Sequence, residues 1–149
     1  MPLLKQVQAL HARHVPHRFH KNGTDEAYLA HFRHGIEERS GFVLCASTAG
    51  QDVGYLFAVL DAAEEDAFCC AREEMVLDQI CVDCNAHRQG VATALIEAFE
   101  TRVSALGLAR WRASHWVFNQ ASAALLLKAG ARPGVMAVSK EMPNESADK

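Results

Sequence analysis

The stretch from Glu73 to Gly107 constrains the fold of this chain most strongly, because its apolar pattern changes period once within it. In an extended conformation the apolar residues of EEMVLDQICV divide between two faces, one with Val76, Ile80 and Val82 and the other with Met75, Leu77 and Cys81. A strand with apolar residues on both faces is buried on both sides. The pattern therefore predicts a strand in the middle of a sheet.

A helix is predicted to follow this strand, after Gly90. Apolar residues then recur at helical spacing, at Val91, Leu95, Ala98, Phe99, Val103 and Leu106. Gly107 can stop this helix in the left-handed conformation. Where a strand turns into a helix N-terminus, several backbone N–H groups stay unpaired and point outwards, and such groups bind phosphate. The turn before Val91 is therefore a candidate anion site.

The chain before this stretch indicates two helices and a hairpin. Apolar spacing predicts a short helix over residues 3–13, which ends before Pro16. Thr24 is a suitable N-cap for a second helix, which ends near Ser40-Gly41. An antiparallel hairpin is predicted for the runs FVLCAST and VGYLFAVL, which are joined by AGQD. The acidic segment DAAEEDAFCCARE that follows predicts a loop.

The chain after Gly107 continues with alternating elements. RWRASHWVF predicts a second strand, and Asn119 precedes the helical run QASAALLLKAG. Apolar and polar residues alternate loosely from Val135 to Glu141, which predicts a closing strand. The segment ESADK predicts a frayed tail.

The order of these elements resembles the acyl-CoA-binding core of the GNAT N-acetyltransferase superfamily. The loop of that family reads Arg or Gln, two residues, Gly, one residue, then Gly or Ala, and here it stands as His87-Arg88-Gln89-Gly90-Val91-Ala92, with His in the first place. The resemblance continues through the second strand and Asn119 to Lys128-Ala129-Gly130. It covers about half of the chain, from Asp52 to Pro133.

The resemblance implies a fold, a cofactor and a set of binding residues. The fold is α/β, with a mixed, mostly antiparallel central sheet flanked by helices in a single acyltransferase-like domain over residues 1–149. The first strand of the family is missing, because the chain begins almost inside the first helix. Acetyl-CoA would be the acyl donor, with no metal, and its expected contacts are Ile80, Cys81, Val82, His87, Arg88, Gln89, Gly90, Val91, Ala92, Thr93 and Asn119.

The same resemblance implies catalytic residues on the strand before the loop. The acceptor amine arrives protonated, so a base must take its proton before the nitrogen can attack the thioester. Asp78 and then Glu74 are the candidates, because they stand in the same phase of the strand as Ile80 and Val82. The family often uses a Tyr to protonate the thiolate, but that position is Leu126 here. His115 is a weak substitute.

Length and charge limit the kind of protein further. A chain of 149 residues supports one domain with a real core. Its net charge of −3 argues against a nucleic-acid partner. No window approaches the roughly 20 apolar residues of a membrane helix. The N-terminus lacks the apolar core of a signal peptide, so we expect a cytoplasmic protein with reduced cysteines.

Two alternatives to an N-acetyltransferase follow from particular residues. A CoA-binding sensor or interaction module that lost the acid is favoured by Leu126 and by Ala131, which replaces an aromatic of the family. A metal-binding protein would use Cys81 and Cys84 with the histidines His11, His14, His17 and His20. Pro16 interrupts the histidine series, which weakens this interpretation.

The missing first strand also predicts an assembly. It leaves residues 42–48 at the sheet edge without a charge or a Pro to discourage pairing. We therefore expect a covering loop or a homodimer in which a partner pairs with this edge, with the helix over residues 3–13 helping to hold the two chains. The acceptor is an amine that the sequence does not identify. The acids Glu64, Glu65 and Asp66 would favour a cationic one.

Overall fold

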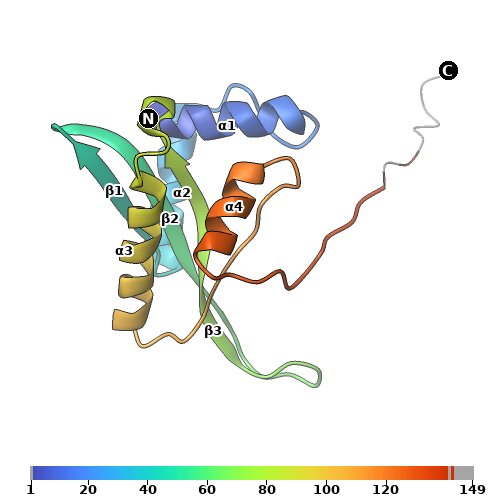
Figure 1. Cartoon of the computed structure of the whole chain (residues 1–149). Helices are drawn as coiled ribbons and strands as arrows, with labels where there is room; N and C mark the ends of the chain where they lie inside the picture. The colour runs from blue at the N-terminus through green and yellow to red at the C-terminus, as the bar shows by residue number, and fades with distance from the viewer. Residues whose placement is uncertain (1, 141, 143–149) are drawn as a thin grey trace, which may run out of the picture.

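The computed structural model describes residues 2–140 and 142, and its centre is a four-stranded sheet in the order β1-β2-β3-β4 (Figure 1). The strands are β1 (Phe42–Thr48), β2 (Gln51–Ala63), β3 (Arg72–Val82) and β4 (Trp111–Ala113). β1, β2 and β3 pair antiparallel, and β4 pairs parallel to β3. The predicted mixed, mostly antiparallel sheet with an interior strand over residues 73–82 is confirmed.

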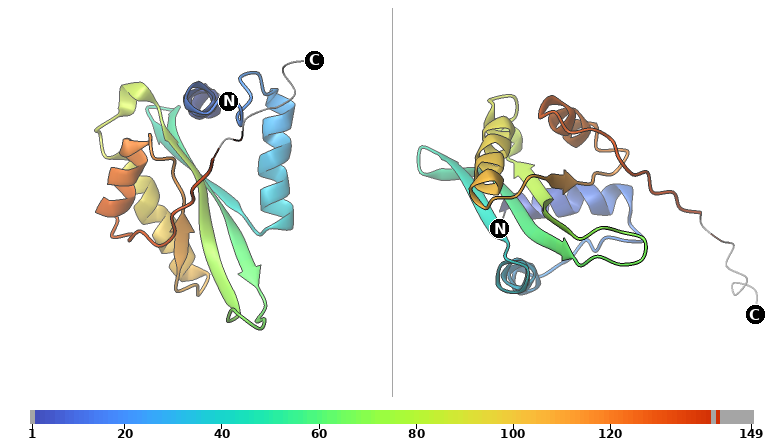
Figure 2. Two further views of the ribbon diagram at one scale, coloured as in Figure 1. Left: turned by 90° about the vertical axis from the view of Figure 1, so that its right-hand side faces the viewer. Right: turned by 90° about the horizontal axis from the view of Figure 1, so that it is seen from below.

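Helices cover both faces of this sheet (Figure 2). They are α1 (Pro2–His14), α2 (Asp25–Glu38), α3 (Val91–Ala105) and α4 (Gln120–Lys128), with a short 3-10 helix, η1, at Cys84–Ala86. α1 and α2 lie on one face, and α3 and α4 on the other. None of the helices in the described part of the chain is long and apolar enough to cross a bilayer.

The predicted ends of the helices agree with the structure. Thr24 caps α2, and its side chain accepts a hydrogen bond from the backbone N–H of Ala27 at 3.2 Å. Asp25 and Glu26 stand in the first turn of that helix, where they complement its dipole. Gly107, with φ of 76°, follows α3 as predicted.

Two apolar cores result from the alternation along β2. Leu56 and Ala58 face α3, and Tyr55, Phe57 and Val59 face α1 and α2. The core on the α3 side contains the buried residues Leu56, Ala58, Met75, Leu77, Leu95, Ile96, Phe99 and Val103. The central strands are thus fixed by packing on both faces, which leaves little freedom in their register.

The faces predicted for β3 are wrong, because a bulge changes the phase of the strand. Phe57 pairs with Gln79 and Ala58 with Leu77, so Asp78 lies between them without a partner in β2. The extra residue reverses the alternation that a regular strand would keep. Ile80 and Val82 therefore pack with Met75 and Leu77 on the α3 side, whereas Val76 lies with Cys81 on the α1 side.

Several predicted boundaries also differ. β2 and β3 extend into the predicted acidic loop, which shrinks to residues 64–71 at the tip of a long hairpin. β4 has three residues, far fewer than the predicted run over 110–118. Residues 135–140 form no strand and run away from the body of the molecule (Figure 1). Glu141 and the tail ESADK lie outside the described residues, and no strand precedes α1 in residues 2–140.

Candidate active site

β3 and β4 separate in the middle of the sheet and leave an open strand edge. Their pairing begins at Met75 with Trp111 and ends at Leu77 with Ala113. β3 continues to Val82, and within the described chain no strand pairs with this part of its β4-facing edge. Ile80, Cys81 and Val82, three of the predicted cofactor residues, lie on the open segment. Its unpaired backbone groups can hydrogen-bond an extended ligand, as an added strand would.

The loop that follows β3 presents backbone N–H groups to solvent. Arg88 and Gly90 adopt positive φ angles of 61° and 82°, and α3 begins at Val91. Within the described part of the chain, no protein group accepts a hydrogen bond from the N–H groups of residues 88–93. Because these groups surround the positive end of the α3 dipole, the loop is suited to bind an anion such as a pyrophosphate. It contains the remaining predicted loop residues, Gln89, Ala92 and Thr93 among them.

Side chains fix this loop to the rest of the molecule. His87, which stands where the family has Arg or Gln, places its Nε2 3.0 Å from the carbonyl oxygen of Val82, so it closes the loop onto the end of β3. Asp83 caps η1 by accepting from the N–H of Asn85 at 2.9 Å, and its other oxygen accepts from Gln6 of α1 at 3.1 Å. These hydrogen bonds, that from the Asn85 N–H first, hold the pKa of Asp83 below its usual value.

Asp78 lies at the separation of the two strands, in the bulge. Its side chain is 37% exposed, and its Oδ2 is 3.5 Å from Nε2 of His31 on α2. Gln79 donates to the same oxygen from its side-chain amide at a long distance of 3.4 Å. Tyr55 donates to the amide oxygen of Gln79 at 2.9 Å. Four side chains from α2, β2 and β3 thus form one polar network around the bulge.

Tyr55 is the most buried member of this network. Burial is the main cause that raises the pKa of its hydroxyl, and the nearby Cys81 and Asp78 raise it further. The phenol therefore keeps its proton at neutral pH and acts as a donor. Of these four residues, only Asp78 was predicted from the sequence. The one signal for His31 was its spacing, three residues after Tyr28, which places the two side chains on neighbouring turns of the helix.

Glu74 has different surroundings. It accepts a hydrogen bond from Nε of Arg112 at 2.9 Å, while Nη2 of Arg112 donates to Asp61 at 2.8 Å. Arg112, by this hydrogen bond first, holds the pKa of Asp61 below its usual range, and Asp61 in turn raises the pKa of Arg112. Glu74 therefore belongs to an ion-pair cluster in the paired part of the sheet, away from the open edge.

The other residues singled out in the sequence have local structural roles. Asn119 caps α4, with its side-chain oxygen 3.1 Å from the N–H of Ser122. His115 contacts the carbonyl oxygen of its neighbour Trp116 at 3.1 Å. Leu126 lies in α4. Its carbonyl oxygen accepts from the N–H of Ala131.

The histidines and cysteines do not converge on one point. His11 stacks on Phe19 with ring centroids 4.9 Å apart, and His14 stacks on Phe118 at 4.2 Å. Cys81 is buried under α1, where its thiol donates to the carbonyl oxygen of Leu3 at 3.3 Å, and burial raises its pKa to about 11. Residues 2–140 and 142 contain no group of three or more His, Cys, Asp or Glu arranged to hold a metal ion.

Comparison with known proteins gives a family and a fold. The model of the acetyltransferase (GNAT) family matches residues 7–131. No curated protein sequence matches the chain significantly. Solved structures do match it. Their sequence identities to this chain are low, so they show only that the fold is shared.

Three of these structures illustrate the similarity. A mutant of the BH1408 protein from Bacillus halodurans has a TM-score of 0.84 at 18% identity, over 95% of this chain and 90% of that one. The aminoglycoside N-acetyltransferase AAC(6')-Iy in complex with CoA has a TM-score of 0.67 at 18% identity, over 93% and 88%. An aminoglycoside acetyltransferase from an uncultured soil metagenomic sample, HMB0005, has a TM-score of 0.64 at 23% identity, over 95% and 91%.

Proposed function

Because the chain belongs to the acetyltransferase (GNAT) family, we propose that it transfers the acetyl group of acetyl-CoA to a primary amine by direct attack of the amine on the thioester. The proposal treats residues 1–149 as one catalytic domain. It also retains the expected cytoplasmic location and a homodimeric state.

One observation carries the proposal: the free N–H groups of residues 88–93 lie directly after the open edge of β3. A pyrophosphate bound by the loop leaves the pantetheine arm to run along this edge. The arm contains amide groups, which can hydrogen-bond the unpaired backbone between Asp78 and Val82. The thioester at the end of the arm would then approach the bulge.

The chemistry at the bulge requires a base, and Asp78 supports that role. Its carboxylate is partly open to solvent, so it can take a proton from the ammonium group of the acceptor, directly or through a water. The free amine attacks the carbonyl carbon of the thioester, the C–S bond breaks, and the nitrogen releases its second proton to water as the amide forms. With Leu126 where the family has Tyr, the thiolate would take its proton from water.

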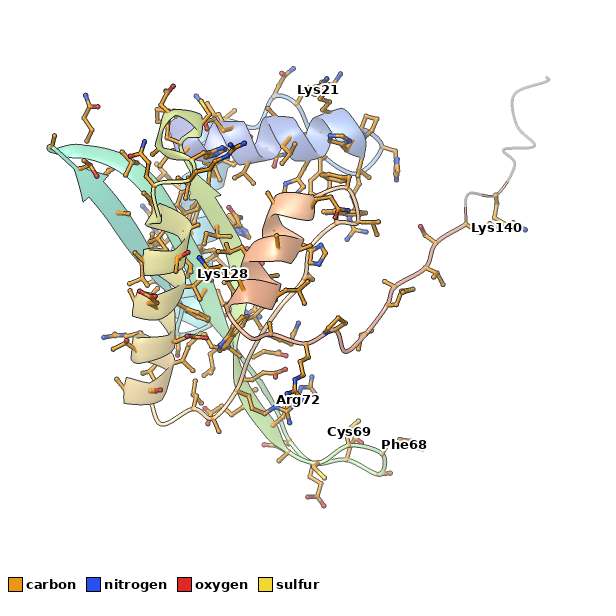
Figure 3. All side chains as sticks on the ribbon, in the orientation of Figure 1. Lys21, Phe68, Cys69, Arg72, Lys128 and Lys140 are labelled. Atoms are coloured by element: carbon orange, nitrogen blue, oxygen red, sulfur yellow. The ribbon has the colours of Figure 1, made fainter. Side chains whose placement is uncertain are left out.

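The acceptor is proposed only as a class, a cationic primary amine. The acids Glu64, Glu65 and Asp66 do not support this choice, because they belong to the loop between β2 and β3. That loop carries Phe68 and Cys69 at the tip of the hairpin (Figure 3), whereas Asp78 lies well inside β3. Asp78 itself provides the negative charge. An aminoglycoside, spermidine and a peptide with a free N-terminus form a suitable panel, the first because AAC(6')-Iy and HMB0005 are described as aminoglycoside acetyltransferases.

A CoA-binding module without turnover is the second candidate. It is favoured by Leu126, since nothing at that position can protonate the leaving group. The two candidates share the cofactor loop and differ in chemistry. Release of free CoA with any amine of the panel would support the enzyme, and tight CoA binding without release would support the module.

Cofactor binding itself is tested by charge reversal at Gly90. A side chain built there meets no atom within 4 Å, so Gly90→Glu disturbs the fold only by the strain of a positive φ, about 1 kcal/mol. The new carboxylate would stand among the N–H groups proposed to bind phosphate. Calorimetry should therefore show loss of acetyl-CoA binding, whereas Arg88→Ala should weaken it only modestly.

Gly107 provides a matched control at the other end of α3. It also has a positive φ, 76°, and open space around it. Gly107→Glu should therefore cost similar backbone strain and keep normal acetyl-CoA affinity. Equal affinities in the Gly90 and Gly107 variants would refute the assignment of the cofactor loop.

A further inference from the structure

His31 lies on α2 with one edge of its ring against the sheet, and 55% of its side chain is exposed to solvent. Its ring lies edge to face with Phe57 at a centroid distance of 5.7 Å and with Phe32 at 5.9 Å. One turn further along α2, Gly35 allows close approach to β2, since a Cβ there would be 2.4 Å from Cζ of Phe57. Close helix packing thus brings the imidazole beside two aromatic rings, which favour its orientation toward β3.

The partner of His31 is the carboxylate of Asp78, which lies on the same face of β3 as Val76 and has Gln79 beside it because of the bulge. The distance from Nε2 of His31 to Oδ2 of Asp78 is 3.5 Å. Gln79 contacts the same oxygen, and the hydrogen bond from Tyr55 fixes the Gln79 amide so that its nitrogen faces Asp78. The other oxygen, Oδ1, has no hydrogen-bond partner within the described chain.

This arrangement holds one carboxylate oxygen and leaves the other free for a proton. We propose that His31 is a positioning residue for acetyl transfer: its Nε2–H donates to Oδ2 of Asp78 and orients the carboxylate so that Oδ1 accepts the proton of the amine. The inference rests on the proposed function. It adds a residue from a separate helix, α2, to a site otherwise built from β3 and the loop before α3.

The proposal differs from a purely structural role of His31 in one measurable respect. A positioning residue acts only through Asp78, so removing it should matter only while Asp78 is present. If His31 merely packed α2 against the sheet, its removal would have the same effect in both backgrounds. A double-mutant cycle separates the two cases.

The variants are His31→Phe, which keeps a ring against Phe57 but has no donor, and His31→Gln, which restores an N–H donor. His34→Phe, at an exposed position on the same helix, is the matched control. Turnover is measured as CoA release from acetyl-CoA with an aminoglycoside, spermidine and a peptide N-terminus as acceptors. The melting temperature and the KM for acetyl-CoA are measured alongside.

His31→Phe should lower kcat about 10- to 100-fold, with the KM for acetyl-CoA and the melting temperature nearly unchanged. His31→Gln should recover most of the loss, and His34→Phe should behave as the unmodified protein. In an Asp78→Asn background, His31→Phe should reduce kcat no further.

Two results would overturn the positioning role while the unmodified protein remains active. One is an equal loss of kcat from His31→Phe in both backgrounds, and the other is a His31→Gln variant as slow as His31→Phe. A protein that releases no CoA with any amine of the panel would instead refute the proposed function, and the role of His31 with it.

Discussion

Asp78 owes its surroundings to the bulge in β3. Regular alternation from Val76 places Asp78 on the α1/α2 face, and the bulge then keeps Gln79 on that same face, so that Asp78 contacts both His31 and the Gln79 amide. Bulges commonly redirect a side chain next to an active site. The residue that matters most for the proposed chemistry is therefore also the one at which the regular strand pattern fails.

Asp78 and Glu74, the two candidate bases, can be told apart by matched amide substitutions. Asp78→Asn removes the proton acceptor and should lower kcat by about 100-fold or more, with nearly normal acetyl-CoA affinity. Glu74→Gln should leave kcat almost unchanged, because that carboxylate is held by Arg112 away from the open edge. Steady-state kinetics and calorimetry provide the measurements. A larger loss of kcat in Glu74→Gln than in Asp78→Asn would make Glu74 the base in place of Asp78.

The ion pairs of Arg112 predict a particular pH dependence of stability. Since the pKa of Asp61 is lowered in the folded state, its pairing contributes its full stability above the unfolded value, near 3.8. The contribution is lost as the pH falls from there through the lower folded value. Arg112→Gln should thus reduce the free energy of unfolding at pH 7 by about 1 kcal/mol or less, and the difference should shrink below pH 3.8.

Urea unfolding of both proteins between pH 3 and 7 would measure this difference. Arg110→Gln is a suitable control, since no ion pair of Arg110 is found in residues 2–140. A difference between the Arg112 variant and the unmodified protein that stays constant down to pH 3 would contradict the assignment to Asp61.

At the scale of single residues the sequence predicted the backbone geometry of the loop before α3 but not the surroundings of Asp78. Gly90 and the N–H groups after it follow from local signals, a strand that ends and a helix that begins. The contacts of Asp78 depend on His31, which lies 47 positions earlier in the chain. No local pattern encodes which helix packs beside a strand, so this part of the site required the structure.

α2 takes its place on the sheet through the small size of Gly35. A methyl group at this position would be 2.4 Å from Phe57 and 3.0 Å from Val59, both buried. Gly35→Ala would gain up to about 1 kcal/mol of helix propensity but lose roughly 1–3 kcal/mol through overpacking. The net effect should be destabilising, by about 1 kcal/mol.

Thermal unfolding should show this as a melting temperature lower by roughly 2–4 °C. Gly134→Ala, where an added Cβ meets nothing within 4 Å, should leave the melting temperature unchanged. A Gly35→Ala protein with a higher melting temperature would mean that the Phe57 ring moves aside at little cost and that Gly35 does not determine the position of α2.

Among the elements, the helices and β1 were predicted accurately, whereas the lengths of β2 and β4 were not. α2 begins at its predicted cap because capping is a local hydrogen bond. The strands depend on partners: β2 and β3 extend each other beyond their apolar runs, to Ala63 and Arg72. β4 stays short because only three of its residues reach β3. Strand length is thus a property of pairs, which one sequence segment does not specify.

For the molecule as a whole, the exposed side of β1 is the feature that predicts assembly. β1 pairs with β2 on one side, and within the described chain no strand pairs with its other side. Val43 and Cys45, on the face that α3 does not cover, are both exposed, so an added strand would cover apolar surface as well as backbone groups. Such edges favour pairing with a second chain.

We therefore expect a homodimer that pairs along β1. Light scattering at micromolar concentration should give twice the monomer mass of 16.3 kDa, and the amides of residues 42–48 should exchange slowly with solvent. Ser47 is a position for a disruptive change, since Ser47→Pro removes an N–H at the edge. A monomer whose β1 amides exchange freely would exclude this assembly.

The thiol of Cys81 is buried beneath α1, so its rate of reaction with a thiol reagent can measure how often that helix detaches. The other cysteines, Cys45, Cys69, Cys70 and Cys84, are exposed, and Cys69 stands at the tip of the β2–β3 hairpin (Figure 3). A thiol reagent would modify these four quickly and reach Cys81 only when α1 lifts from the sheet. The slow last step of the reaction would then report the rate at which α1, whose Gln6 donates to Asp83 after β3, detaches and returns.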